Sequence, residues 1–298
     1  MAFLAVFVLG AAIFVVGSEM LIRYVAAPAD DFERYRLLFR SATAPIAVFG
    51  DSQVANAIVT SPDVVNLGYP AETLPLMLFK AEAFAGAKKP KGVILQLSPQ
   101  QFAIYRAENA QDEFRQELLG GSEPLLQFTR PHFRRYLLAH WQALFHRWTS
   151  SPAKGTAAPQ EPRSFADWPA AEQRRNAEIR VQLHAPLPAG SATERLLRSL
   201  RDTLVDLRKR GIATCVVRYP LSEVYRKAAS AVPSFAMLSS RVEDLTREQG
   251  ATFVDLSDAL PDRLLGDPDH VGPAGRATVT AMVIDRCFAD RTARQMRP

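Results

Sequence analysis

A serine near the start of the chain stands in a setting that could support nucleophilic catalysis. Gly50-Asp51-Ser52-Gln53 directly follows a short apolar run, residues 45–50, which we predict to be a β-strand. A serine in this place lies at the carboxyl edge of a sheet, where open α/β folds bind their ligands. The helix that we expect next would offer unpaired backbone N–H groups to a developing oxyanion. Because Gly-Asp-Ser is also common in turns, the tripeptide alone does not establish catalysis.

A histidine near the other end of the chain ends a motif with the composition of a general base and its partner. The motif is Asp267-Pro268-Asp269-His270, between the last predicted strand and the last predicted helix. A serine nucleophile needs a base within hydrogen-bond reach, and that base needs an acceptor on its other nitrogen. An aspartate three residues ahead of a histidine can fold back within one turn to hold the imidazole. Taken alone, His270 could equally cap backbone groups at the helix entry.

The other histidines show no pattern of metal ligands. His132, His140 and His146 fall in one predicted helix but do not share a face of it, and we place His184 in a loop. We therefore predict no metal site.

The two cysteines, Cys215 and Cys287, each have apolar neighbours. We expect two small, buried and unlinked side chains. A disulfide would require that the fold bring them together.

These motifs are placed by an alternation of apolar runs and helical segments. The predicted strands are residues 45–50, 64–68, 92–98, 212–220 and 251–257. We expect a helix over 73–86 that ends at Gly86, a helix that starts with a capping box of Ser191 and Glu194, and one that runs to Gly250. The last helix has Pro273 in its first turn. Five strands alternating with helices predict a three-layer α/β domain with a parallel sheet.

A long insertion, residues 100–190, interrupts this alternation. Residues 132–148 are typical of a helix with aromatic and basic faces, and residues 150–164, rich in Pro, Ala and Ser, of a flexible loop. We interpret the insertion as a helical cap or a partner surface. Its aromatic side chains would either stack on sugars or contact a membrane partner, or else be buried in the cap.

The N-terminus carries an apolar segment that reaches Ile22. Its length is about the 20 residues that a helix needs to cross a bilayer. The alternative is a core helix at the start of the domain, but a helix packed on a domain surface should show a polar stripe, which is absent here. A cleaved signal peptide would use Val25-Ala26-Ala27, but Glu19 and Arg23 separate that site from the apolar run. We therefore predict an uncleaved anchor over residues 1–27 and a globular domain over residues 28–298.

The overall composition is that of a globular protein. Of the 298 residues, 48% are hydrophobic and 22% charged, which excludes a disordered chain and a multi-span membrane protein. The net charge of +5 permits contact with anionic lipid or polymer, but it is too small for this length to indicate nucleic-acid binding. No Gly-rich phosphate loop follows the first strand, which argues against a dinucleotide-binding domain.

Gly-Asp-Ser after the first strand and Asp-x-x-His after the last resemble the SGNH/GDSL hydrolase superfamily, over roughly residues 44–99 and 191–288. The resemblance implies a flavodoxin-like fold in which Ser52 is the nucleophile, His270 the base and Asp267 its orienting acid. Asn66-Leu67-Gly68 is similar to the second block of the family. This implies an oxyanion hole formed by the N–H groups of Ser52 and Gly68.

The third block departs from the family pattern of Gly-x-Asn-Asp. This chain has Gln96-Leu97-Ser98-Pro99, so that Ser98 occupies the position of the oxyanion-hole Asn. The loss of one such donor costs on the order of a hundredfold in rate, which predicts modest or acyl-specific activity.

The N-terminal anchor and the altered third block together resemble the membrane-anchored branch, which includes proteins of alginate and exopolysaccharide O-acetylation and of teichoic-acid D-alanylation. The resemblance implies an O-acyltransferase outside the cytoplasmic membrane that acts on a cell-envelope or secreted polysaccharide, beside a multi-span acyltransferase, without a metal or organic cofactor. Two alternatives remain. The same residues could serve an esterase of carbohydrates or lipids, or the chain could be a non-catalytic scaffold of such a complex.

Overall fold

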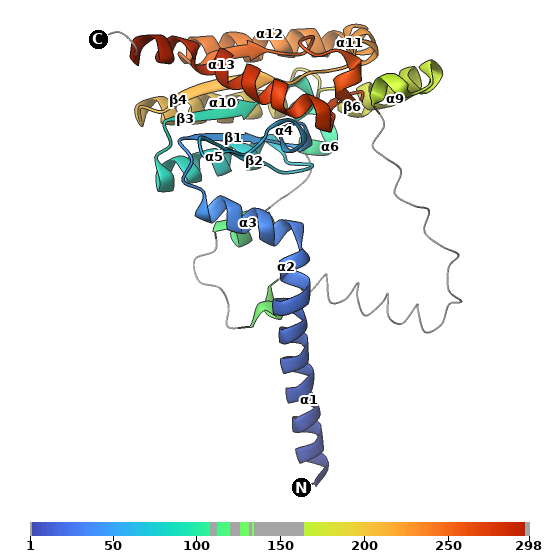
Figure 1. The fold of residues 1–298 in the computed structure, drawn as a ribbon, viewed down its shortest axis with the longest axis vertical. Helices are drawn as coiled ribbons and strands as arrows, with labels where there is room; N and C mark the ends of the chain where they lie inside the picture. The colour runs from blue at the N-terminus through green and yellow to red at the C-terminus, as the bar shows by residue number, and fades with distance from the viewer. Residues whose placement is uncertain (1, 108–111, 120–125, 131–132, 134–163, 296–298) are drawn as a thin grey trace. The chain divides into compact units, whose positions relative to one another are not determined.

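The computed structural model describes residues 2–107, 112–119, 126–130, 133 and 164–295 (Figure 1). The chain forms two compact units. The first unit contains residues 1–41 and 111–159, and the second contains residues 42–110 and 160–298. The units therefore divide the expected insertion between them. They also group residues 28–41 with the N-terminal helix, whereas we expected them in the globular domain.

The second unit is built on a five-stranded parallel sheet. Its strands are β1 (Ile46–Gly50), β2 (Val64–Gly68), β3 (Gly92–Gln96), β4 (Ala213–Arg218) and β5 (Thr252–Asp255). They lie in the order β2-β1-β3-β4-β5, and all neighbours are parallel. This is the flavodoxin-like order, whose strand ends form a ligand-binding edge. The predicted α/β class and five-stranded parallel sheet are confirmed.

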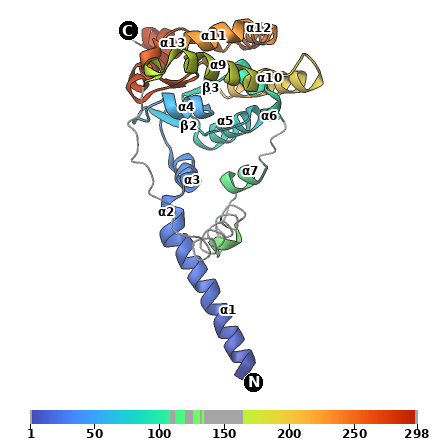
Figure 2. The ribbon, with the colours of Figure 1, turned by 90° about the vertical axis from the view of Figure 1, so that its right-hand side faces the viewer.

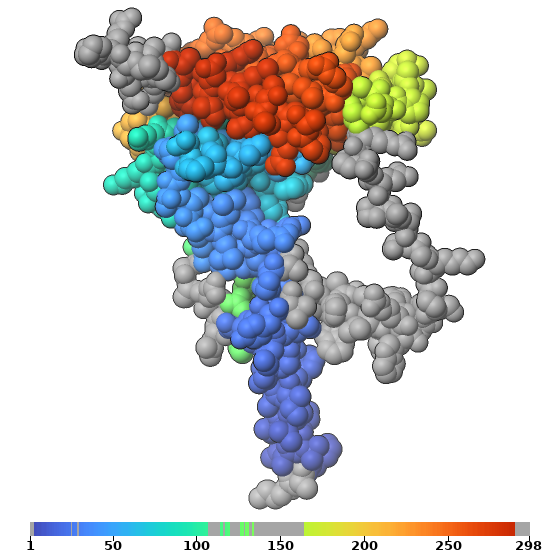
Figure 3. Space-filling view, viewed as in Figure 1, coloured from blue at the N-terminus to red at the C-terminus, as the bar shows by residue number. Residues whose placement is uncertain are grey.

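Helices cover both faces of the sheet. On one face, α4 (Ser52–Ala57) packs against α13 (Arg276–Gln295), which also contacts β5. On the other, α10 (Ser191–Lys209) packs against α5 (Leu74–Lys88) and α12 (Pro233–Glu248). Figure 2 shows the strands between these two layers, and Figure 3 shows α13 covering its face, with α9 (Ala170–His184) at the edge. The segments that connect strands to helices lie at the carboxyl ends of the strands.

Short elements occupy those connections. They are η2 (Pro99–Phe102), α6 (Ile104–Ala107), η4 (Phe165–Asp167), α11 (Glu223–Ser230), η5 (Asp262–Leu264), η6 (Pro273–Gly275) and an antiparallel hairpin of β6 (Leu265–Asp267) and β7 (His270–Val271).

Three predicted helix boundaries differ from the structure. Helix α5 continues past Gly86 to Lys88, because Lys89 takes up the left-handed conformation (φ 49°) that closes its C-terminus. Ser191 is already the first residue of α10 and caps nothing, while Glu194 pairs with Arg241 at 2.7 Å. The single helix expected before Gly250 is two, α11 and α12, because the chain breaks ahead of a proline.

The first unit begins with an apolar helix, α1 (Ala2–Leu21), which continues through the π-helical turn η1 (Ile22–Ala26) into α2 (Ala27–Ala29). The span Phe3–Tyr24 has a mean hydropathy of 2.3 and is long enough to cross a membrane. It is followed by α3 (Asp31–Ser41), and the unit also contains α7 (Asp112–Leu119) and η3 (Gln127–Thr129).

A buried charge cluster joins these later elements. Glu33 of α3 contacts Arg36 at 2.7 Å and also Arg130, which reaches Glu117 at 2.9 Å. Burial alone would raise the pKa of Glu33, but hydrogen bonds from both arginines hold it below its usual value. The predicted helix over 132–148 and loop over 150–164 lie outside the described residues, except for Phe133 and Ser164.

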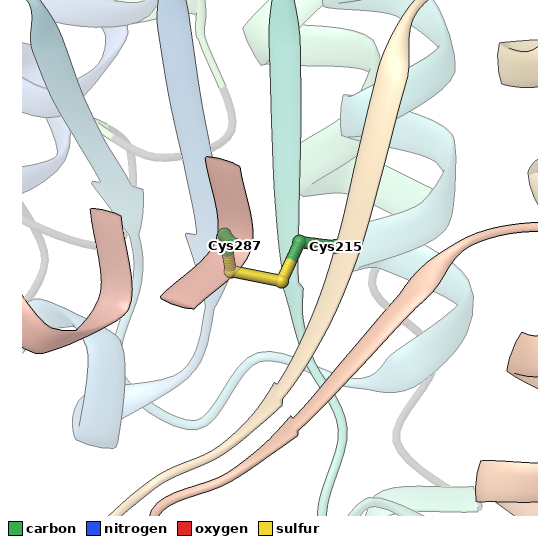
Figure 4. The surroundings of a disulfide bond; sticks show 2 residues. All are labelled: Cys215 and Cys287. Carbon is green, nitrogen blue, oxygen red and sulfur yellow. A yellow bond between two sulfur atoms is a disulfide. The ribbon is translucent and has the colours of Figure 1, made fainter. Parts of the chain in front are cut away.

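A disulfide joins the sheet to its covering helix. Cys215 on β4 is bonded to Cys287 on α13, with their Cα atoms 5.6 Å apart (Figure 4). The expectation of two unlinked side chains is therefore wrong. The two positions are 72 residues apart in the chain and meet only because α13 crosses β4.

Reduction of this disulfide is expected to lower the free energy of unfolding by about 2–5 kcal/mol, because the bond closes a long loop in the unfolded chain. Denaturant unfolding with and without reductant measures the difference. The double variant Cys215→Ala/Cys287→Ala serves as control and should not respond to reductant. An unchanged unfolding midpoint with both thiols shown to be free would contradict the prediction.

Candidate active site

Ser52 lies on a tight turn between β1 and α4. Asp51 caps the helix, because its carboxylate accepts a hydrogen bond from the Gln53 N–H at 2.8 Å. The strand before it must end in glycine, since a Cβ at Gly50 would lie 2.3 Å from the side chains of both Gln96 and Val54. Ser52 is the first helical residue, so its own N–H has no acceptor within the helix. The turn thus presents Ser52 at the carboxyl edge of the sheet.

His270 is carried by the β6–β7 hairpin, which follows β5 at the same edge. Oδ1 of Asp267 accepts hydrogen bonds from the backbone N–H groups of Asp269 at 3.0 Å and His270 at 2.9 Å. The same carboxylate lies 2.9 Å from Nδ1 of His270, and Nε2 of that ring lies 2.8 Å from Oγ of Ser52. The structure therefore brings Ser52, His270 and Asp267 into one hydrogen-bonded row.

The charges in this row favour an ionised Asp267 and a basic His270. Burial opposes the charged form of Asp267, but its hydrogen bond to His270 prevails and lowers its pKa to about 2. Burial likewise opposes a protonated His270, yet the hydrogen bond to Asp267 and the nearby charge of Asp269 raise its pKa. The ring is therefore poised to accept a proton from Ser52.

A second carboxylate, Asp269, lies behind the same ring. It is buried, and its Oδ1 is 3.6 Å from Nδ1 of His270 and 3.7 Å from Arg180. Within the part of the chain that the structure describes, this oxygen has no hydrogen-bond partner. Burial raises the pKa of Asp269 to about 6. The sequence motif contained this residue, but its spacing gave no reason to assign it a role.

His184 is not in a loop, as we predicted, but is the last residue of α9 and is buried. Its Nδ1 lies 2.9 Å from the Tyr225 hydroxyl and 3.8 Å from Asp269. Burial, together with the positive charges of Arg106 and Arg180, lowers the pKa of His184 to about 3, so the ring is neutral near neutral pH.

Buried amides connect the serine turn to the histidine hairpin. Oε1 of Gln96 accepts a hydrogen bond from the Asp51 N–H at 2.8 Å, and its Nε2 donates to Oε1 of Gln53 at 2.8 Å. Nε2 of Gln53 then donates to the carbonyl of Asp269 at 2.9 Å. Sequence reasoning missed both glutamines, because their partners are far away in the chain.

The structure also describes Gly68 and Ser98, the residues expected to complete an oxyanion hole. The N–H of Gly68 donates a hydrogen bond to Oδ1 of Asn66 at 2.9 Å. A Cβ at Gly68 would lie 2.7 Å from the Ala55 nitrogen, and the glycine is thus needed for the approach of β2 to α4. Ser98 follows β3 and lines a pocket whose lining does not include Ser52, His270 or Asp267. Ala71, on the loop after β2, has a φ of 59°, a strained conformation of a kind that clusters at ligand sites.

Asp267, Asp269 and His270 offer atoms within 4.8 Å of one another that could ligate a metal ion. Both nitrogens of His270 already contact protein groups, Asp267 and Ser52. The hydrogen bonds account for the arrangement, and we assign no metal to it.

No protein-family model matches the chain, and no curated protein matches it by sequence. Several solved structures are similar to it at low sequence identity, among them the following three. A GDSL-like lipase from Bacteroides thetaiotaomicron has 10% identity and a TM-score of 0.44, covering 88% of this chain and 98% of the lipase. A lipase/acylhydrolase from Enterococcus faecalis has 13% identity and a TM-score of 0.42, covering 83% and 95%. A catalytic mutant of an acetylxylan esterase from Geobacillus stearothermophilus has 11% identity and a TM-score of 0.42, covering 81% and 93%.

Asp269→Asn is expected to lower the pKa of His270, because it removes a negative charge 3.6 Å from the protonated ring without changing the size of the side chain. The titration of the His270 ring protons by NMR measures the change. If a reaction requires a neutral His270, the acid limb of its pH–rate profile should move to lower pH by the same amount. Asp258→Asn, at an exposed position, is the matched control. An unchanged His270 titration in Asp269→Asn would contradict this interpretation.

Proposed function

We propose that this chain is an SGNH-type serine O-acyltransferase that passes an acyl group, such as acetyl, to a hydroxyl of a cell-envelope or secreted polysaccharide. The observation that carries the proposal is the contact of 2.8 Å between Nε2 of His270 and Oγ of Ser52, with Asp267 at 2.9 Å on the other nitrogen of the ring. A serine, a base and an orienting acid in this order are the requirements of acyl transfer through a covalent intermediate.

The reaction takes place in two halves. Oγ of Ser52 attacks the carbonyl carbon of the acyl donor while its proton passes to Nε2 of His270, and the departing group takes that proton as the donor bond breaks. The acceptor hydroxyl then loses its proton to His270 and attacks the acyl carbon, and the same proton returns to Oγ of Ser52. In the proposed reaction Asp267 stabilises the imidazolium in both halves, and the N–H of Ser52 binds the oxyanion.

The proposed transferase differs from its closest alternative, an esterase, in the molecule that accepts the acyl group. Water in place of the sugar hydroxyl gives hydrolysis by the same residues. A non-catalytic scaffold is the weaker alternative, because it does not explain why Ser52, His270 and Asp267 form a hydrogen-bonded row.

We further propose that α1 holds the chain in the cytoplasmic membrane, with the sheet unit on the outer side, beside a multi-span acyltransferase that supplies the acyl group. The length and hydropathy of Phe3–Tyr24 support the anchor. The Cys215–Cys287 bond supports the outer side, because disulfides persist in oxidising compartments and are rare in the cytosol.

Ser52→Ala and His270→Ala should each reduce hydrolysis of p-nitrophenyl acetate by about a thousandfold or more, because each removes a group that takes part in bond making. Asp267→Asn should lose a similar or smaller amount. The assay uses the full-length protein in detergent, and a fluorophosphonate should label the wild type but not Ser52→Ala. The exposed Ser61→Ala is the control and should behave as the wild type. Equal turnover by the wild type and Ser52→Ala would refute the proposal.

The same assay distinguishes transfer from hydrolysis. For a transferase, added polysaccharide fragments should lower the yield of free acetate per nitrophenol released, because the sugar takes the acyl group. A yield of one acetate per nitrophenol at every concentration of the fragments tested would favour the esterase.

Full-length protein is expected to sediment with membranes and to resist carbonate extraction, while deletion of residues 1–23 should release it. Mass spectrometry of the membrane-bound form should find an intact N-terminus. A chain that starts after Ala27 would instead indicate a cleaved signal peptide, and full-length protein in the soluble fraction would contradict the anchor. Protease digestion of spheroplasts should remove the sheet unit if it lies outside.

A further inference from the structure

A pocket opens at the carboxyl edge of the sheet, beyond β3, β4 and β5. Its volume is about 420 Å³, and its walls come from the segments that follow these strands and from α11 and α12. Pockets of this size hold small organic ligands. Residues of the Ser52–His270–Asp267 row do not line it.

The pocket contains a cation, Arg226, that has no partner among the described residues. Nε of Arg226 is buried and has no hydrogen-bond partner within the described residues, and its guanidinium forms no ion pair with them. The other charged groups of the pocket are already paired, Arg218 with Asp255 at 2.8 Å and Glu243 with Arg247 at 2.6 Å. A partly buried guanidinium of this kind is stabilised by an anion, and its planar donors suit a carboxylate or phosphate.

The remaining wall combines hydroxyls with aromatic rings. The side chains of Ser98, Ser240 and Ser257 line the pocket and form no hydrogen bond with the part of the chain that is described. Phe235 and Tyr225 line it as well, and both are buried. Free hydroxyls exchange hydrogen bonds with sugar hydroxyls, and the two buried rings close the apolar side of the pocket.

We infer that this pocket binds an anionic sugar unit, with Arg226 contacting its carboxylate or phosphate and the three serines its hydroxyls. If this sugar is part of the acceptor polysaccharide, its binding would hold the polysaccharide beside Ser52. The identification of the sugar as part of the acceptor rests on the proposed function. Tyr225 connects the two places, because its hydroxyl lies 2.9 Å from Nδ1 of His184, which is 3.8 Å from Asp269 behind the His270 ring.

Calorimetric titration of the full-length protein in detergent with D-glucuronate, D-glucose 6-phosphate and D-glucose tests the inference. At least one anionic sugar should bind at least about tenfold more tightly than glucose, and Arg226→Ala should weaken its binding by about tenfold or more. Tighter binding of D-glucuronate would identify the acidic group of the ligand as a carboxylate, and tighter binding of D-glucose 6-phosphate would identify it as a phosphate. Ser240→Ala should weaken binding less, and Arg226→Lys should retain part of it.

Lys227→Ala is the matched control, because it removes an exposed charge from the next position of α11 and lies outside the pocket lining. Thermal midpoints of all variants show whether each is folded. Equal binding of glucose and the anionic sugars, wild-type binding by a folded Arg226→Ala, or no saturable binding of either anion would overturn the inference. The titration is also made with Ser52→Ala, which should bind as the wild type. Because sugar binding does not require catalysis by Ser52, a failure of the binding inference can be distinguished from a failure of the proposed Ser52 reaction.

Discussion

One buried hydrogen bond, from Nε2 of Gln53 to the carbonyl of Asp269, ties together two loops that are 216 residues apart in the chain. On one side of this bond stands Ser52, and on the other His270. Both ends are buried, so breaking the bond would leave unsatisfied polar groups at a cost of about 1–3 kcal/mol each. The contact between Oγ of Ser52 and Nε2 of His270 lies next to this bond, and the two together hold the serine turn and the histidine hairpin in position.

Gln53 is in turn fixed from the sheet. Its Oε1 accepts from Gln96 at the end of β3, and Gln96 also accepts from the Asp51 N–H. The carboxylate of Asp51 is buried between Arg106 at 2.7 Å and Gln101 at 3.0 Å. A network with this many satisfied members is rigid, because each side chain is held by more than one partner. The serine turn is therefore built on the carboxyl end of the sheet, and the histidine hairpin is docked onto it.

The hairpin is held from its other side by α13. A Cβ at Gly275 would lie 2.7 Å from the carbonyl of Leu264, so only a glycine lets the chain turn from the hairpin into the helix. Cys287 then pins that helix to β4. The contribution of the disulfide to the site is to fix the helix that follows His270.

The features that could be predicted from the sequence are those set by local interactions. Each strand of the sheet is a short apolar run, Ser52 directly follows the first of them, and Asp267 reaches His270 within a single turn. The fold class and the pairing of Asp267 with His270 follow from such short-range patterns, whereas the expectation that Ser52 joins them comes from the resemblance of the two motifs to a known family. The features that only the tertiary structure decided depend on contacts between segments that are distant in the chain: the disulfide, the burial of His184, and the role of Gln53 and Gln96. The engagement of the Gly68 N–H by Asn66 spans only two residues, but the Asn66 side chain is itself held by the carbonyls of Val54 and Ile58. The N–H of Gly68 shows the physical reason. Its donor capacity is visible in the sequence, but whether it is free depends on how a neighbouring side chain turns when β2 packs against α4, and that packing is a property of the whole fold.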